Sequence, residues 1–332
     1  MEFPKQNFAA TLAEQLAVKP VGTDGDIFES VHCLVRMGNA APIAYGGSTL
    51  GVAIAAAAHT VPSTHKLYSV LGHYLGPAGT SSHVRIKVER TRDTKSFATR
   101  RVRVVQEQKG KERTCLDLLM DFHVVEDAYY QYSAPPVQPI AAAPPAACPT
   151  WEEQIAGHLA KKNINKVVAA LAEDAFAPIN AFFENRGVPQ SVAGQNLLGL
   201  AKRAKTTQDD LPITSRWSSV WCRTRSDRQE SDAAQWAGLA FVMDAALSFL
   251  PLTHSQRFLD DAGACSSLDI ALRVFQPSVD LRAWHLRQAM TKTADAGRTY
   301  SENVLWDEQG RMVASMTQQS IMRAPGQPQP KM

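Results

Sequence analysis

Residues 235–251 read QWAGLAFVMDAALSFLP, an apolar stretch with helical periodicity that carries one charged residue, Asp244, in its interior. Ala240 and Leu247 would lie one turn from Asp244 on the same helical face, which places the acid beside the buried stripe. A buried carboxylate is costly unless hydrogen-bonded groups surround it. The sequence therefore predicts that Asp244 either has polar partners or takes part in chemistry.

The composition of the whole chain is that of a globular protein. The 332 residues are 45% hydrophobic and 20% charged, with a net charge of +3, and have room for about two domains. The basic residues are scattered, and their short clusters are typical of solvated strand faces. We therefore expect no nucleic-acid partner.

Cysteine usage and apolar runs bear on the compartment. The five cysteines are widely spaced without a CxxC pair, which argues against a disulfide framework and against a zinc site. No secretory signal is recognisable, and no apolar run approaches the ~20 residues of a membrane span. We expect an intracellular protein, cytoplasmic or peroxisomal, in which the ending Pro330-Lys331-Met332 is only a weak peroxisomal signal.

Two segments of the chain, here called passes, have the same order of predicted elements, which suggests a tandem duplication. Each pass has a strand, a long apolar helix ended by a proline, a strand ended by a proline, and three further strands. The helices are expected at 49–61 and 235–250, and the proline-ended strands at 67–75 and 266–275. Counting back from Pro62 and Pro251 sets Ala55 opposite Asp244, so the second half is predicted to carry the chemistry.

A stretch rich in proline and alanine, residues 133–149, separates the two passes. We therefore predict an N-terminal domain over residues 1–132, a connector over 133–213 that becomes helical, and a C-terminal domain over 214–325. Helices this apolar are expected to be buried and not exposed to solvent. An antiparallel sheet wrapped around each helix is therefore the expected packing.

Several motifs together resemble the acyl-CoA thioesterase II family, whose members are tandem double-hotdog proteins. They are Tyr45-Gly46-Gly47, the strand end 74–77 (YLGP), the run 88–102 (VERTRDTKSFATRRV), Ser267-Leu268-Asp269, and 314–323 (ASMTQQSIMR). The resemblance implies an α+β fold, a double hotdog with two antiparallel sheets, each around a long apolar helix, packed side by side.

The resemblance also implies site residues. An aspartate, a hydroxyl residue and a glutamine act together in the second half of the family, and these roles fall on Asp244, Ser267 and Gln318. The hydroxyl residue is serine here where threonine is typical. The first half departs further, because Leu71 occupies the place of a frequent histidine, with His73 two positions later.

Substrate contacts are expected from the first half, at Tyr45, Gly46, Gly47, His73 and Arg100. For Arg100 a structural role is the competing interpretation, because an RDxxSF turn can tie a hairpin through side-chain hydrogen bonds. Asp269 is the competing carboxylate, since an unbulged strand would point it to the same face as Ser267. Asp244, Ser267 and Gln318 could also be a buried polar network that only joins helix to sheet.

The predicted reaction is hydrolysis of an acyl-CoA, or of an acyl group on a carrier, without a metal or a cofactor. A thioester carbonyl needs a positioned water, a proton acceptor and donors for the oxyanion. Two alternatives stay open: a dehydratase or cyclase that acts on a carrier-bound polyketide, and a non-catalytic acyl-CoA-binding protein. Assembly into a homo-oligomer is also possible.

Overall fold

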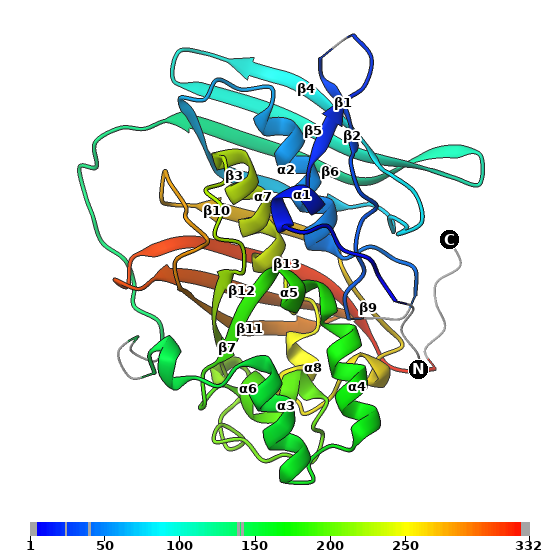
Figure 1. Ribbon diagram of the computed structural model, residues 1–332, viewed down its shortest axis with the longest axis vertical. Coiled ribbons are helices and arrows are strands. Elements are labelled where there is room, and N and C mark those ends of the chain that lie inside the picture. The colour runs from blue at the N-terminus through cyan, green and yellow to red at the C-terminus, as the bar shows by residue number, and fades with distance from the viewer. Residues whose placement is uncertain (1–4, 24, 39–40, 138–139, 141–142, 327–332) are drawn as a thin grey trace.

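A computed structural model of the chain describes residues 5–326 except 24, 39, 40, 138, 139, 141 and 142 (Figure 1). The C-terminal Pro330-Lys331-Met332, expected above as a weak peroxisomal signal, lies outside the described residues. Every described helix is too short or too polar to span a bilayer.

Each half of the molecule is a sheet that curves around one apolar helix. The first half contains α1 (Leu12–Gln15), β1 (Val18–Pro20), β2 (Ile27–Ser30), α2 (Gly46–Ala58), β3 (His65–Tyr74), β4 (Arg85–Asp93), β5 (Phe97–Gln108) and β6 (Lys111–Val124). The second half contains β8 (Ser218–Thr224), α7 (Asp232–Met243), α8 (Leu250–His254), β9 (Ala264–Ser267), β10 (Asp269–Val274), β11 (His285–Asp295), β12 (Arg298–Asp307) and β13 (Met312–Arg323).

The two sheets join edge to edge. β3 pairs with β10 in antiparallel register, with His73 opposite Asp269. The described strands therefore form one sheet in the order β1-β2-β4-β5-β6-β3-β10-β13-β12-β11-β8-β7, in which β7 spans Phe183–Gly187. β9 pairs with β13 beside this path. The predicted pair of antiparallel sheets therefore lies side by side as one continuous surface.

The core is centred on the contact between α2 and α7. The helices run antiparallel, because Gly46 at the start of α2 lies against Asp244 after the end of α7, while Gly51 lies against Ala237. Most residues of both helices are buried, as their apolar composition predicts. At Gly51 a Cβ atom would lie 2.8 Å from Leu16 Cδ1 and 3.2 Å from the Ala237 carbonyl oxygen, so the absence of a side chain permits the close approach.

The second helix is shorter than the sequence pattern predicts. α7 ends at Met243, and a turn in which Ala246 has φ 65° leads to α8, where Pro251 stands in the first turn. Asp244 is therefore the C-cap of α7, and the prediction that it lies inside a helix ended by Pro251 is wrong. The physical reason is nonlocal: side chains from β11 and β12 donate to the last carbonyls of the helix.

The predicted strand 266–275 is also interrupted. Leu268 separates β9 from β10, so Ser267 pairs with Ser320 of β13 whereas Asp269 pairs with His73 of β3. The backbone N–H of Tyr74 donates to the Leu268 carbonyl at 2.9 Å and takes part in this change of partner. The expectation that Ser267 and Asp269 share a face of one unbroken strand is therefore wrong.

The connector folds onto the second half. It contains α3 (Trp151–Ala160), α4 (Lys166–Ala175), α5 (Ala177–Phe182), β7 (Phe183–Gly187) and α6 (Val192–Asn196), with short 3₁₀ helices at Pro145–Ala147, Leu197–Gly199 and, at its end, Ile213–Ser215. A further 3₁₀ helix, Leu259–Asp261, lies in the second half between α8 and β9. β7 pairs with β8, so the sheet of the second half begins before the boundary predicted at residue 214. In Figure 1, α3 and α4 form the lower end of the molecule.

The close contact between the helices generates a stability prediction. Gly51→Val would force two methyl groups into the α2–α7 interface, and we expect it to lower the free energy of unfolding by about 1–3 kcal/mol. Urea denaturation followed by circular dichroism measures this. Gly157→Val is the matched control, because no atom lies within 4 Å of the Cβ position there. Equal stability of the two variants would contradict the tight packing.

Candidate active site

Asp244 lies where the C-terminus of α7 meets the N-terminus of α2. Asp244 is 5% exposed and faces the first turn of α2, where the Gly47 backbone N–H favours the charged form of its carboxylate. A carboxylate at the end of its own helix is disfavoured by that helix dipole, but the N-terminus of α2 supplies the opposite field. The antiparallel packing thus gives the acid a favourable position that α7 alone could not.

Gln318 is the second member of the site. Its Nε2 donates to Asp244 Oδ1 at 2.8 Å, and its side chain is 1% exposed. The Ser320 hydroxyl in turn donates to Gln318 Oε1 at 3.4 Å. Because Gln318 occupies Oδ1, the other carboxylate oxygen, Oδ2, is left on the side of Gly46.

Ser267 lies next to Ser320 and not directly beside the Asp244–Gln318 pair. It stands opposite Ser320 in the β9–β13 register, and Ser320 and Gln318 share a face of β13 because they are two residues apart. Among the described residues, the Ser267 hydroxyl makes no hydrogen bond to Asp244 or Gln318. The structure therefore brings Asp244 and Gln318 into contact and places Ser267 at the border of the same surface.

Burial changes the acidity of Asp244. Desolvation raises its pKa from 3.8 to about 6, against the opposing effects of the Gln318 hydrogen bond, the Gly47 N–H and the Arg287 charge. A carboxylate with this pKa is mainly ionised at pH 7, yet is a stronger base than an exposed aspartate. The site can accept a proton near neutral pH.

Tyr45, Gly46 and Gly47 form the beginning of α2 against Asp244. The Tyr45 hydroxyl donates to the Phe241 carbonyl at 2.6 Å, so its single proton is already used although the ring lies beside the carboxylate. At Gly46 a Cβ atom would lie 2.9 Å from Asp244 Oδ2, which explains why this position has no side chain. These three residues shape the site from the first half.

Tyr74, the last residue of β3, was missed by the sequence analysis. Its hydroxyl lies 2.9 Å from the same Cβ position of Gly46 that Asp244 Oδ2 approaches, and it has no hydrogen-bond partner among the described residues. Burial and the neighbouring Asp244 raise its pKa well above 10, so the phenol keeps its proton. The quoted YLGP strand end contained this residue but gave no indication that it faces the second half.

Two further polar side chains on β12 face the site. Ser301 stands opposite Gln318, and Asn303 donates from Nδ2 to the Met243 carbonyl at 2.7 Å. Ser301 Oγ and Asn303 Oδ1 are buried without a partner among the described residues. The alternation of β12 could have placed both inward, but only the register with β13 shows that Ser301 adjoins Gln318. Buried unpaired polar atoms are rare, and three of those in the described residues, from Tyr74, Ser301 and Asn303, lie around this one carboxylate.

Arg100, His73 and Asp269 lie apart from this cluster. Arg100 is fully buried in the first half, where it donates to the Thr60 hydroxyl and carbonyl and to Asp93 Oδ1 at 2.7 Å, so it is not accessible to a substrate. The expectation that Arg100 contacts substrate is therefore not supported. Its hydrogen bonds agree with the competing interpretation, a structural role.

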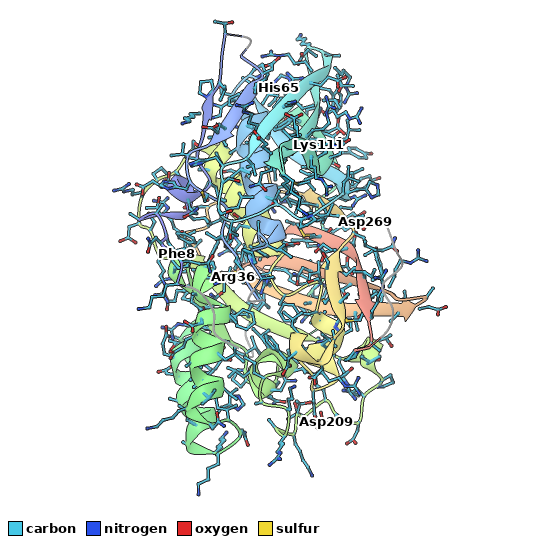
Figure 2. The ribbon with its side chains drawn as sticks, turned by 90° about the vertical axis from the view of Figure 1, so that its right-hand side faces the viewer. Phe8, Arg36, His65, Lys111, Asp209 and Asp269 are labelled. Carbon is cyan, nitrogen blue, oxygen red and sulfur yellow. The ribbon has the colours of Figure 1, made fainter. Side chains whose placement is uncertain are left out.

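His73 is exposed opposite Asp269 at the junction of the two sheets. Figure 2 shows Asp269 at this level between the two halves. The Asp269 carboxylate accepts hydrogen bonds from the backbone N–H and the side-chain Nε2 of Gln319. Gln319 points to the opposite face of β13 from Gln318, so Asp269 is turned away from Asp244 and acts as a polar anchor.

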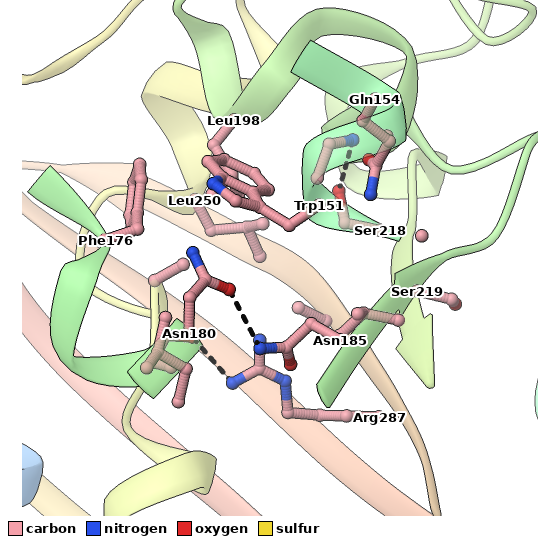
Figure 3. A pocket seen from close by; sticks show the side chains of 18 of the residues that line it. Trp151, Gln154, Phe176, Asn180, Asn185, Leu198, Ser218, Ser219, Leu250 and Arg287 are labelled. Carbon is pink, nitrogen blue, oxygen red and sulfur yellow. Dashed lines mark hydrogen bonds between the residues drawn. The ribbon is translucent and has the colours of Figure 1, made fainter. Parts of the chain in front are cut away.

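A chamber adjoins the turn that follows Asp244 (Figure 3). Ala245, Ala246 and Leu250 form one wall, strands β7, β8 and β11 form another, and the connector supplies Trp151 and Phe176. Arg287 of β11 donates to the Val242 and Ala245 carbonyls at the end of α7 and also lines the chamber. Within the described part of the chain, no three acidic, histidine or cysteine side chains gather as metal ligands would.

Comparison with protein families matches both halves to related models. Residues 35–123 match the model described as the acyl-CoA thioesterase N-terminal domain, and residues 179–322 match the acyl-CoA thioesterase C-terminal domain. The acyl-CoA thioesterase 2 of Haemophilus influenzae is 21% identical over 280 residues, which cover 84% of this chain and 87% of that protein.

Known structures are similar over nearly the whole chain. The acyl-CoA thioesterase II TesB2 from Mycobacterium marinum has a TM-score of 0.66 at 21% identity, covering 96% of this chain and 99% of that one. A protein of unknown function with a hot dog fold from Alicyclobacillus acidocaldarius has a TM-score of 0.66 at 16% identity, covering 95% and 98%. These similarities confirm the predicted fold class.

The environment of Asp244 leads to a direct prediction about its ionisation. With ¹³C-labelled aspartate, we expect one carboxyl resonance of the folded protein to titrate near pH 6, because burial disfavours the charged form. Asp244→Asn should remove that resonance and identify it. If the resonance lost in the variant instead titrates near 3.8 or below, the carboxylate is more solvated than its burial indicates.

Proposed function

The chain belongs to the acyl-CoA thioesterase family, and we propose that it hydrolyses the thioester of an acyl-CoA, or of a related acyl carrier, by means of Asp244 and a bound water. The products are a free acid and a thiol. The observation that carries the mechanism is the buried Asp244–Gln318 pair at the start of α2, with unpaired polar atoms around it.

Asp244 acts as the base in this proposal. Gln318 holds Oδ1, so Oδ2 receives a proton from the water as the water oxygen attacks the thioester carbonyl carbon. Collapse of the tetrahedral intermediate breaks the carbon–sulfur bond, and the departing sulfur takes up the proton. Positioned proton transfer of this kind typically contributes about 10²–10⁴-fold to the rate.

The developing oxyanion requires a donor that is already in place. The Tyr74 hydroxyl is protonated, buried and unpaired, and it comes from the first half to within reach of the Asp244 surface. A fixed donor in a dry site stabilises an oxyanion more than the same donor in water. We assign this role to Tyr74, with Ser301 and Ser267 as hydroxyls that can help to hold the water.

The proposed reaction is tested by thiol release from short, medium and long acyl-CoAs. Asp244→Asn should remain folded and lose about 10²–10⁴-fold in kcat, because the amide cannot accept the proton. Asp295→Asn, an exposed acid at the end of β11, is the control and should retain activity. Thiol release by Asp244→Asn at the wild-type rate would refute the assignment of Asp244 as the base. Silence of the wild type on every acyl-CoA would favour a carrier-bound substrate or simple acyl binding.

Tyr74→Phe tests the donor separately from the base. Removal of the hydroxyl leaves the ring in place and takes away one oxyanion hydrogen bond, so we expect kcat to fall about 10²–10³-fold with little change in KM. Tyr68→Phe is the matched control, because Tyr68 lies on the same strand but is exposed. A change in KM alone would show that Tyr74 contributes to uniform substrate binding.

A further inference from the structure

The chamber beside α7 is mostly apolar, and most of its polar side chains already have partners. Asn185 donates to Asn180 Oδ1 at 3.2 Å, Ser218 is bonded to His254 Nε2 at 2.9 Å, and Ser219 accepts from Gln288 at 3.0 Å. Its far wall is apolar, where the Trp151 and Phe176 rings pack edge to face. Such a lining suits a hydrocarbon chain.

The exceptions are Trp151, whose buried Nε1–H has no partner among the described residues, and Arg287. One nitrogen, Nη1, donates to the Val242 and Ala245 carbonyls, but among the described residues Nε and Nη2 donate to no protein acceptor, and no carboxylate lies within 4 Å. Figure 3 shows the guanidinium along the chamber edge below Asn180 and Asn185. The carbonyl end of α7 offsets part of the charge, but half of the guanidinium fork is left for a ligand.

The Arg287 side chain is half-buried, and a guanidinium binds carboxylates and carbonyls through two parallel N–H groups. The two carbonyls that Arg287 already binds flank Asp244 in the sequence, one on each side. Ala245 and Ala246, which follow Asp244, line the chamber together with Arg287, so an acyl chain that enters the chamber from a thioester at Asp244 would pass the free edge of Arg287.

We propose that the chamber receives the acyl chain, and that Arg287 selects acyl groups with an acceptor oxygen on the third carbon, either a ketone or a carboxylate. This inference rests on the proposed function and names its substrate class: oxygenated rather than plain fatty acyl thioesters. The connector, through Trp151 and Phe176, supplies the wall against which the apolar remainder of the chain packs.

The test compares matched thioesters. We would measure kcat/KM for butyryl-, acetoacetyl- and malonyl-CoA, which differ at the third carbon, and for decanoyl- against 3-oxodecanoyl-CoA. For the wild type, kcat/KM should be at least about tenfold higher for an oxygenated substrate than for the matched plain one, because one hydrogen bond to a charged group contributes that much. The acetoacetyl and malonyl substrates distinguish a ketone from a carboxylate as the acceptor.

The variants separate selection from structure. Arg287→Met also loses the bonds that hold the end of α7, so all rates should fall, and the ratio between oxygenated and plain substrates carries the test. That ratio should approach one in Arg287→Met and stay at the wild-type value in Arg311→Met, where the arginine pairs with Asp307 at an exposed turn. A wild-type ratio of one, or an unchanged ratio in Arg287→Met, would overturn the proposal.

A binding measurement distinguishes failure of this inference from failure of the hydrolytic function. Calorimetric titration of decanoyl- and 3-oxodecanoyl-CoA into Asp244→Asn, with and without Arg287→Met, requires no turnover. If the oxo substrate binds more tightly and Arg287→Met abolishes this difference, the proposed role of the chamber is supported even if no thioester is cleaved. Equal binding of both substrates by Asp244→Asn overturns the chamber even if hydrolysis is observed.

Discussion

The contact between the N-terminus of α2 and the C-terminus of α7 is the constraint on which the site depends. It brings the amide of Gly47, from the first half, onto a carboxylate of the second half whose own helix disfavours it. The contact is possible only because Gly46 has no side chain. Burial of the helices, which stabilises the fold, is therefore also the cause of the raised pKa of Asp244.

Much of this arrangement could be predicted from the sequence. The apolar helices, the alternating strands and the two-pass order fix the fold class, because periodicity reflects which face is buried. Asp244 could be identified because it is the one acid in an apolar stretch. Gln318 could be identified because the resemblance to a known family implies it. The meeting of these two side chains depends on the β12–β13 register and on the end of α7, which are properties of the folded chain.

Other features could not be predicted from local pattern. The end of α7 at Met243 depends on donors from Arg287 and Asn303, which follow it by more than forty positions in the sequence. Tyr74 is an ordinary strand residue until β3 pairs with β10 and its hydroxyl reaches the other half. A local sequence window contains only one partner of such a contact. The end of the helix and the side chains that reach from one half to the other could therefore not be predicted.

The antiparallel helix pair has a second end, and it shows what tandem fusion makes possible. There the acid is Asp232, in the first turn of α7, half-exposed and bonded to Lys66 at 2.5 Å. In a dimer of identical subunits, twofold symmetry would repeat every substitution at both ends. Within one chain the symmetry is broken: one end is closed by an ion pair, and the other is free to become a reaction centre. The proposed function then implies one reaction centre for each pair of hotdog units.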